Sequence, residues 1–130
     1  MSQPSTLGGQ LAAVARLLIE RPDPETAGLW PRAAALLARQ SVETSLETLW
    51  ITHVPGLETC SMRAQLACLP EYLDHSLGLR VGLTWSALSV SCHEHAFAVA
   101  PTAGELRTWL SVCEELDAAV TEPDHHNAPG

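Results

Sequence analysis

The sequence predicts an all-α protein, a four- to five-helix up-down bundle. Apolar residues recur with the helical period of about 3.6 residues along most of the chain. No segment shows sustained alternation of polar and apolar residues, and no Asn-Gly or Asp-Gly dipeptide offers a hairpin turn. The length of 130 residues suits a single hydrophobic core. We therefore assign residues 1–120 to one helical-bundle domain and residues 121–130 to a disordered tail.

Two helices are expected in the first part of the chain. The first covers residues 7–20 and stops before Pro22, because proline disfavours helical geometry in the residue that precedes it. Residues 23–26, Asp-Pro-Glu-Thr, are typical of a helix start, and Pro31 then either kinks that helix or restarts it before it continues to His53. The expected core stripe of the first helix is Leu7, Leu11, Val14 and Leu18, with Ala15 and Ile19 beside it.

Two further helices are expected in the middle of the chain. The third opens near Thr59 or Ser61, carries a regular apolar stripe, and should kink or break at Pro70. Gly78 is placed to cap its C-terminus. The fourth covers residues 79–98, and it has a core stripe and a second face of small residues. The core stripe is Val81, Trp85, Leu88, Cys92, Ala96 and Val99, and the small-residue face is Gly82, Ser86 and Ser89.

The fifth helix has the clearest start signal in the chain. Thr102 and Glu105 have the spacing of a capping box, in which each side chain accepts a hydrogen bond from the other residue's backbone N–H group. Pro101 and Leu106 are placed as a hydrophobic staple around this start. The expected core face is Leu106, Trp109, Leu110, Cys113, Leu116 and Val120.

Composition and charge limit the classes of partner. Seven arginines, no lysine and fifteen acidic residues give a formal charge of −8. Binding to nucleic acid gains from clustered Lys and Arg, so we do not expect this chain to bind nucleic acid. No apolar run approaches the length of about 20 residues that a membrane span needs, and we expect no membrane partner. Residues 1–10 lack a signal-peptide pattern, so we expect a cytoplasmic protein.

The cysteines do not predict a disulfide framework or a metal site by their spacing. No two of them form a C-x-x-C pair, and a cytoplasmic chain would keep them reduced. They are expected to be buried as small apolar residues. The four are Cys60, Cys68, Cys92 and Cys113.

One cluster of chemically capable residues, Cys92-His93-Glu94-His95, lies near the end of the fourth helix. At about 100° per residue, Cys92 and His95 share a face, whereas His93 projects to the side of Ser86 and Ser89. Two ligands are too few for a closed tetrahedral metal site, so we expect no metal and no other cofactor. A hydrogen-bonded histidine pair at a helix end or subunit interface is favoured over a metal-binding or catalytic pair. The candidate binding residues are therefore Ser86, Ser89, His93 and His95, and no catalytic residue is assigned.

The stretch 32–50, RAAALLARQSVETSLETLW, resembles the first core helix of HEPN domains. The resemblance implies an all-α fold and a homodimer, and the helix order is compatible with the family over residues 7–120. Catalytic HEPN domains share an R-x(4–6)-H motif, but no arginine here stands five to seven residues ahead of a histidine. The residues that match the helix pattern are Ala35, Leu37 with Ala38, Gln40, Glu43, Leu46 and Leu49.

These observations leave three functions to consider, beside that of a small-molecule binder. The favoured one is a non-catalytic, HEPN-like homodimer that acts as an interaction or regulatory protein and binds a protein partner. The second is a divergent HEPN-type RNase or toxin, in which His93 or His95 acts as acid-base group and Arg80 or Arg63 stabilises phosphate. The third is a metal-binding or redox-sensing bundle that uses Cys92 and His95 with a distant cysteine or histidine.

Overall fold

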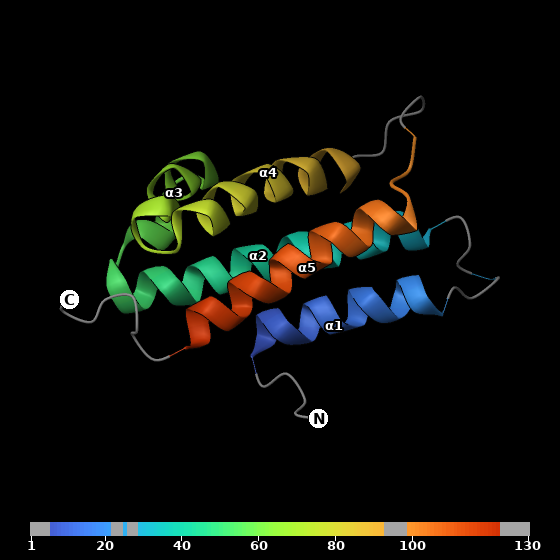
Figure 1. The fold of residues 1–130 in the computed structure, drawn as a ribbon, viewed down its shortest axis with the longest axis horizontal. Helices are drawn as coiled ribbons and strands as arrows, with labels where there is room; N and C mark the ends of the chain where they lie inside the picture. Colours follow the sequence, from blue (N-terminus) through green and yellow to red (C-terminus); the bar gives the residue numbers. More distant parts are fainter. Residues whose placement is uncertain (1–5, 22–24, 26–28, 93–98, 123–130) are drawn as a thin grey trace.

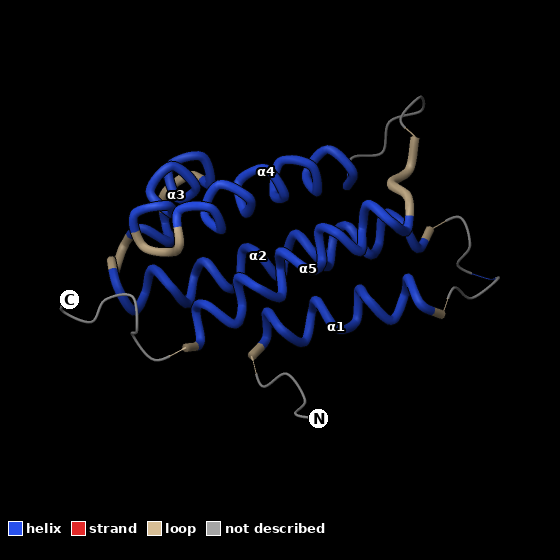
Figure 2. Tube along the Cα trace, viewed as in Figure 1, coloured by secondary structure: helices blue, strands red, loops and turns tan. Residues whose placement is uncertain are grey.

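The computed structural model describes residues 6–21, 25, 29–92 and 99–122, and these residues form helices, turns and no strand (Figure 2). The all-α prediction is confirmed. Four long helices run alternately up and down, and the short helix α3 lies beside the first half of α4 (Figure 1). The helices are α1 (Leu7–Glu20), α2 (Trp30–His53), α3 (Met62–Cys68), α4 (His75–Cys92) and α5 (Ala103–Thr121), with the 3₁₀ turns η2 (Leu57–Thr59) and η3 (Leu69–Glu71).

The helix α2 lies at the centre of the bundle and packs against α1, α4 and α5. Its restart at Pro31 is confirmed, because Trp30 and Pro31 begin a helix that continues without interruption to His53. Proline is tolerated in the first turn, where its missing N–H group would have no partner within the helix. Of the expected earlier start at residues 23–26, only Glu25 belongs to the described residues.

The buried face of α1 differs from the predicted stripe. Its core residues are Gly8, Gly9, Ala12, Ala15 and Ile19, whereas Leu7 and Val14 are exposed. The helix presents its small residues to α2, because the two backbones approach closely. A Cβ atom on Gly8 would lie 2.6 Å from the Ser45 hydroxyl oxygen. Ala15 and Ile19, which were expected beside the stripe, are buried, and Leu18 packs partly buried against the core.

The break at Pro70 is confirmed, but the helix boundaries on its C-terminal side were predicted wrongly. The helix α3 ends at Cys68, and α4 begins at His75, where the Asp74 carboxylate accepts a hydrogen bond of 3.1 Å from the Leu77 N–H group. Gly78 lies buried inside α4 and is not a C-terminal cap. It is needed for space, since a Cβ atom there would lie 2.8 Å from the Pro70 Cα atom.

The start of α5 is confirmed in detail. The Thr102 hydroxyl accepts from the Glu105 N–H group at 3.1 Å, and the Glu105 carboxylate accepts from the Thr102 N–H group at 2.9 Å. Pro101 and Leu106, the expected staple, are both buried. The helix extends to Thr121, the first residue of the expected tail, and residues 123–130 lie outside the described residues.

Candidate functional site

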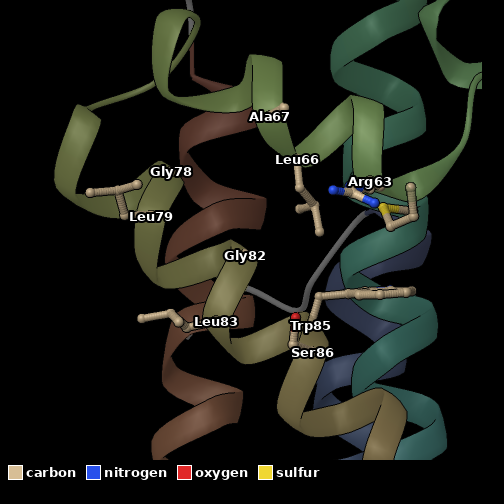
Figure 3. A pocket seen from close by; sticks show the side chains of 10 residues that line it. Arg63, Leu66, Ala67, Gly78, Leu79, Gly82, Leu83, Trp85 and Ser86 are labelled. Carbon is tan, nitrogen blue, oxygen red and sulfur yellow. The ribbon is translucent and has the colours of Figure 1, made fainter.

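An apolar recess lies between α3 and α4, and we name it the α3–α4 groove. It has a volume of about 830 Å³. Side chains of both helices face it, and Arg63 is its one charged lining residue (Figure 3). It is lined by Met62, Arg63, Leu66, Ala67, Gly78, Leu79, Gly82, Leu83, Trp85 and Ser86.

A buried polar contact holds α3 in the position that forms this groove. The Trp50 indole donates a hydrogen bond of 3.0 Å to the Gln65 side-chain oxygen, and the Gln65 amide donates to the Cys60 carbonyl at 2.9 Å. The Tyr72 ring packs edge-on against Trp50, with 5.4 Å between the ring centroids. Because buried polar groups need partners, Gln65 fixes the rotation of α3 and leaves Leu66 and Met62 facing the groove.

The side of α4 next to the groove is apolar and open, and we name it the α4 outer face: Leu79, Leu83, Ser86 and Val90. The exposed fractions of Leu79, Leu83 and Val90 are 52%, 74% and 71%. These residues share one helical face, offset from the core stripe of Val81 and Leu88. Large exposed apolar patches are uncommon on isolated soluble proteins and indicate interaction surfaces.

The outer face also carries no charge. Arg80 is the only Asp, Glu, Lys or Arg residue of α4, and it lies on the side toward α5. There its guanidinium group donates to the Glu115 carboxylate at 2.7 Å, and this contact raises the pKa of Arg80. Arg63, at the groove, forms no ion pair with any residue in the described part of the chain.

Trp85 connects the groove to a polar contact between α2 and α4. Its ring lines the groove, and its indole N–H group donates to Glu43 of α2 at 3.1 Å. The Arg39 Nε atom lies 3.5 Å from the same Glu43 oxygen.

Cys92 lies near the pair of Arg39 and Glu43. Burial raises the pKa of the Cys92 thiol, the Arg39 charge lowers it by less, and the Glu43 charge raises it further, so the thiol is a weak nucleophile at neutral pH.

Three buried polar atoms of α2 and α4 have no hydrogen-bond partner: Arg32 Nε and Arg39 Nε of α2, and Ser89 Oγ of α4. A buried donor without a partner costs about 1–3 kcal/mol. The Ser45 hydroxyl, on the α1 side of α2, is a further such atom. The Ser45 hydroxyl is packed closely against Gly8, which explains why it has no partner. The other three atoms have no such explanation.

The predicted binding residues are divided between these places. Ser86 is exposed and lines the α3–α4 groove. Ser89 is half-buried and lies on the side of α4 that carries Trp85, one helical turn further along. His93 and His95 lie outside the described residues. The exposed leucines of the outer face were not predicted, although Leu79, Leu83 and Val90 form a second apolar stripe in the sequence.

The residues of the metal-binding alternative form no ligand cluster in the described part of the chain. No group of three His, Cys, Asp or Glu residues there is placed to hold an ion. His75 and Cys92 stand at opposite ends of α4, about 25 Å apart along the helix axis. Cys113 is buried, with its thiol 3.5 Å from the Ala38 carbonyl oxygen.

Comparisons with protein-family models, curated proteins and solved structures found no match. Among the described helices, none combines the length and the apolar character needed to cross a membrane.

Proposed function

We propose that this chain is a non-catalytic, HEPN-like interaction or regulatory protein that works as a homodimer. The α4 outer face and the α3–α4 groove form the surface that receives the second copy. The observation that supports this proposal most strongly is that the surface is apolar and open, with Leu83 74% exposed.

Charge favours a second copy at this surface over the face of α5. Each copy has a formal charge of −8, so two copies repel wherever acidic residues meet. The α4 outer face holds no acidic residue, whereas α5 carries Glu105, Glu114, Glu115 and Asp117. Contact through α4 therefore keeps the acidic residues of the two copies apart.

The shape of the surface also favours self-association. A twofold-symmetric contact uses the same patch on both copies, so the patch must complement itself. The outer face supplies projecting leucines, and the groove beside it supplies an apolar recess next to Gly82, which has no neighbouring atoms within 4 Å of an added Cβ. Leu83 of each copy can enter the recess of the other.

The HEPN-like and non-catalytic parts of the proposal have separate support. Residues 32–50, which carry the resemblance, form one uninterrupted helix at the centre of an up-down bundle. Arg80, one of the two arginines considered for phosphate, is committed to Glu115. The Cys92 thiol is held in its protonated form by burial, which favours neither nucleophilic nor metal chemistry there.

The proposal is tested by placing a charge on the outer face and measuring the dimer dissociation constant by sedimentation. Leu83→Asp should weaken the dimer more than about tenfold, because a carboxylate would be buried against leucines. Leu17→Asp is the matched control, since Leu17 is 52% exposed but lies on α1. A dimer that survives Leu83→Asp and is lost with Leu17→Asp would place the contact on α1 and overturn this assignment of the surface.

A further inference from the structure

The α3–α4 groove has the size and the lining of a small-molecule site. Its volume of about 830 Å³ lies within the range of about 300–1,000 Å³ that is usual for such sites. Apart from Arg63 and Ser86, the residues that line it are apolar. Its floor is open at Gly82, where an added Cβ atom would meet nothing within 4 Å. The groove therefore suits a ligand with an apolar body and a single polar end.

The charge of the groove lies at one side of it. In Figure 3, Arg63 and Trp85 lie on one side of the groove, and Leu79 and Leu83 lie on the other (Figure 3). Arg63 is exposed and forms no ion pair with any residue that the structure describes. No acidic residue lines the groove, so no carboxylate of the lining competes for this guanidinium group. Charge complementarity therefore favours an anionic end on the ligand, and a guanidinium group pairs well with a carboxylate.

The length of the groove along α4 indicates the size of the apolar body. The lining residues of α4 extend from Gly78 to Ser86, and the helix rises about 12 Å over these eight steps. An extended medium-length alkyl chain has a similar length. The aliphatic side chains of Leu66, Leu79 and Leu83 provide the contacts that such a chain needs.

We propose that the α3–α4 groove binds an amphipathic carboxylate of the medium-chain fatty-acid type. Its alkyl chain lies along α4 over Gly82, and its carboxylate pairs with Arg63 at the rim. The alkyl chain and Leu83 of a second copy need the same recess, so the ligand should dissociate the dimer. This competition rests on the dimer proposed above, whereas the binding of the carboxylate does not.

Isothermal titration of the full-length protein with sodium octanoate, octanol and octyltrimethylammonium, all below micelle-forming concentrations, tests the site. We expect saturable binding of one octanoate per chain, at least about threefold tighter than the binding of the other two. This order is diagnostic, because a chain with a formal charge of −8 attracts the cation and repels the anion unless Arg63 acts locally. The absence of saturable octanoate binding overturns the proposal, as does binding of octanol or the cation that is equally tight or tighter.

Variants assign the binding to the groove. Gly82→Leu should abolish it while the far-ultraviolet circular dichroism spectrum stays helical, because the new side chain fills an open space. Arg63→Gln should weaken octanoate binding about threefold or more and leave octanol binding within about twofold. Arg107→Gln is the matched control, since Arg107 is also exposed but lies on α5, away from the groove. Octanoate binding that survives both groove substitutions, or is lost with Arg107→Gln, contradicts the assignment.

Sedimentation of the wild-type protein with and without octanoate distinguishes this proposal from that of the dimer. A dimer that does not bind octanoate overturns the ligand site and leaves the dimer in place. A monomer that binds octanoate, and loses this binding with Gly82→Leu, supports the ligand site and removes the dimer. A dimer that binds octanoate and keeps its mass at saturation contradicts the shared use of the groove.

Discussion

Gly78 illustrates how a single residue sets the geometry of the site. It is buried in α4 against Pro70, and an added Cβ atom would meet the Pro70 backbone at 2.8 Å. Gly78→Ala should therefore lower the free energy of unfolding by about 1–3 kcal/mol, because backbone atoms must move to admit the methyl group. Urea denaturation measures this change.

Gly82 provides the matched control, one helical turn further along α4. An added Cβ atom there meets nothing within 4 Å. Gly82→Ala should raise the free energy of unfolding by about 0.5–1 kcal/mol, through the better helix propensity of alanine. Equal effects of the two substitutions would show that the contact with Pro70 is not the reason for Gly78.

Cys113 makes the stability of the folded protein depend on pH in the alkaline range. Burial raises its pKa from 9.0 to about 12. The unfolded chain therefore loses this proton above pH 9, while the folded chain keeps it. The contribution to stability is fully present below pH 9 and is lost as the pH rises toward 12. The free energy of unfolding should fall by up to about 1.4 kcal/mol per pH unit in this window.

The contribution of this thiol is separated from other alkaline titrations by comparison with Cys113→Ala. That variant should be less stable at pH 7 because of the cavity it creates, but its stability should decline less steeply between pH 9 and 12. Identical slopes for the two proteins in guanidinium denaturation would contradict the raised pKa of Cys113.

At the scale of the helix, the capping box at the start of α5 should contribute measurably to stability. Thr102→Ala removes the hydroxyl that accepts from the Glu105 N–H group at 3.1 Å, and should cost about 1 kcal/mol in thermal or urea unfolding. Thr108→Ala is the control, because the Thr108 hydroxyl only donates to the Gly104 carbonyl within the same helix. This variant should stay within about 0.5 kcal/mol of the wild type. A loss as large as that of Thr102→Ala would contradict the role of the cap.

Helix existence was predictable from the sequence, but the orientation of each helix was less so. The capping box, the restart at Pro31 and the break at Pro70 are local signals, and the structure has all three. The buried face of α1 depends on how closely another helix approaches. The small residues around Gly8 therefore face α2, and Leu7 and Val14 do not. The prediction that Gly78 is a C-terminal cap was wrong for the same reason, because glycine suits both a helix cap and a close contact between helices.

The candidate site was predictable only in part, for a physical reason at the scale of the whole molecule. Ser86 was placed on a small-residue face, and it lines the α3–α4 groove. The groove forms only when α3 folds back beside α4. The hydrogen bond between Trp50 and Gln65 holds α3 there, and it joins residues of two different helices. Such a contact has no signature in the sequence of either helix.

The proposed function depends on the association of two copies of this chain through α4. Sedimentation equilibrium of the wild-type protein over a range of micromolar concentrations tests it most directly. We expect a mass of twice the 13.9 kDa of one chain, with dissociation on dilution. A mass of 13.9 kDa that stays constant up to the highest concentration would contradict it, because the apolar α4 outer face would then remain exposed in the working form of the protein.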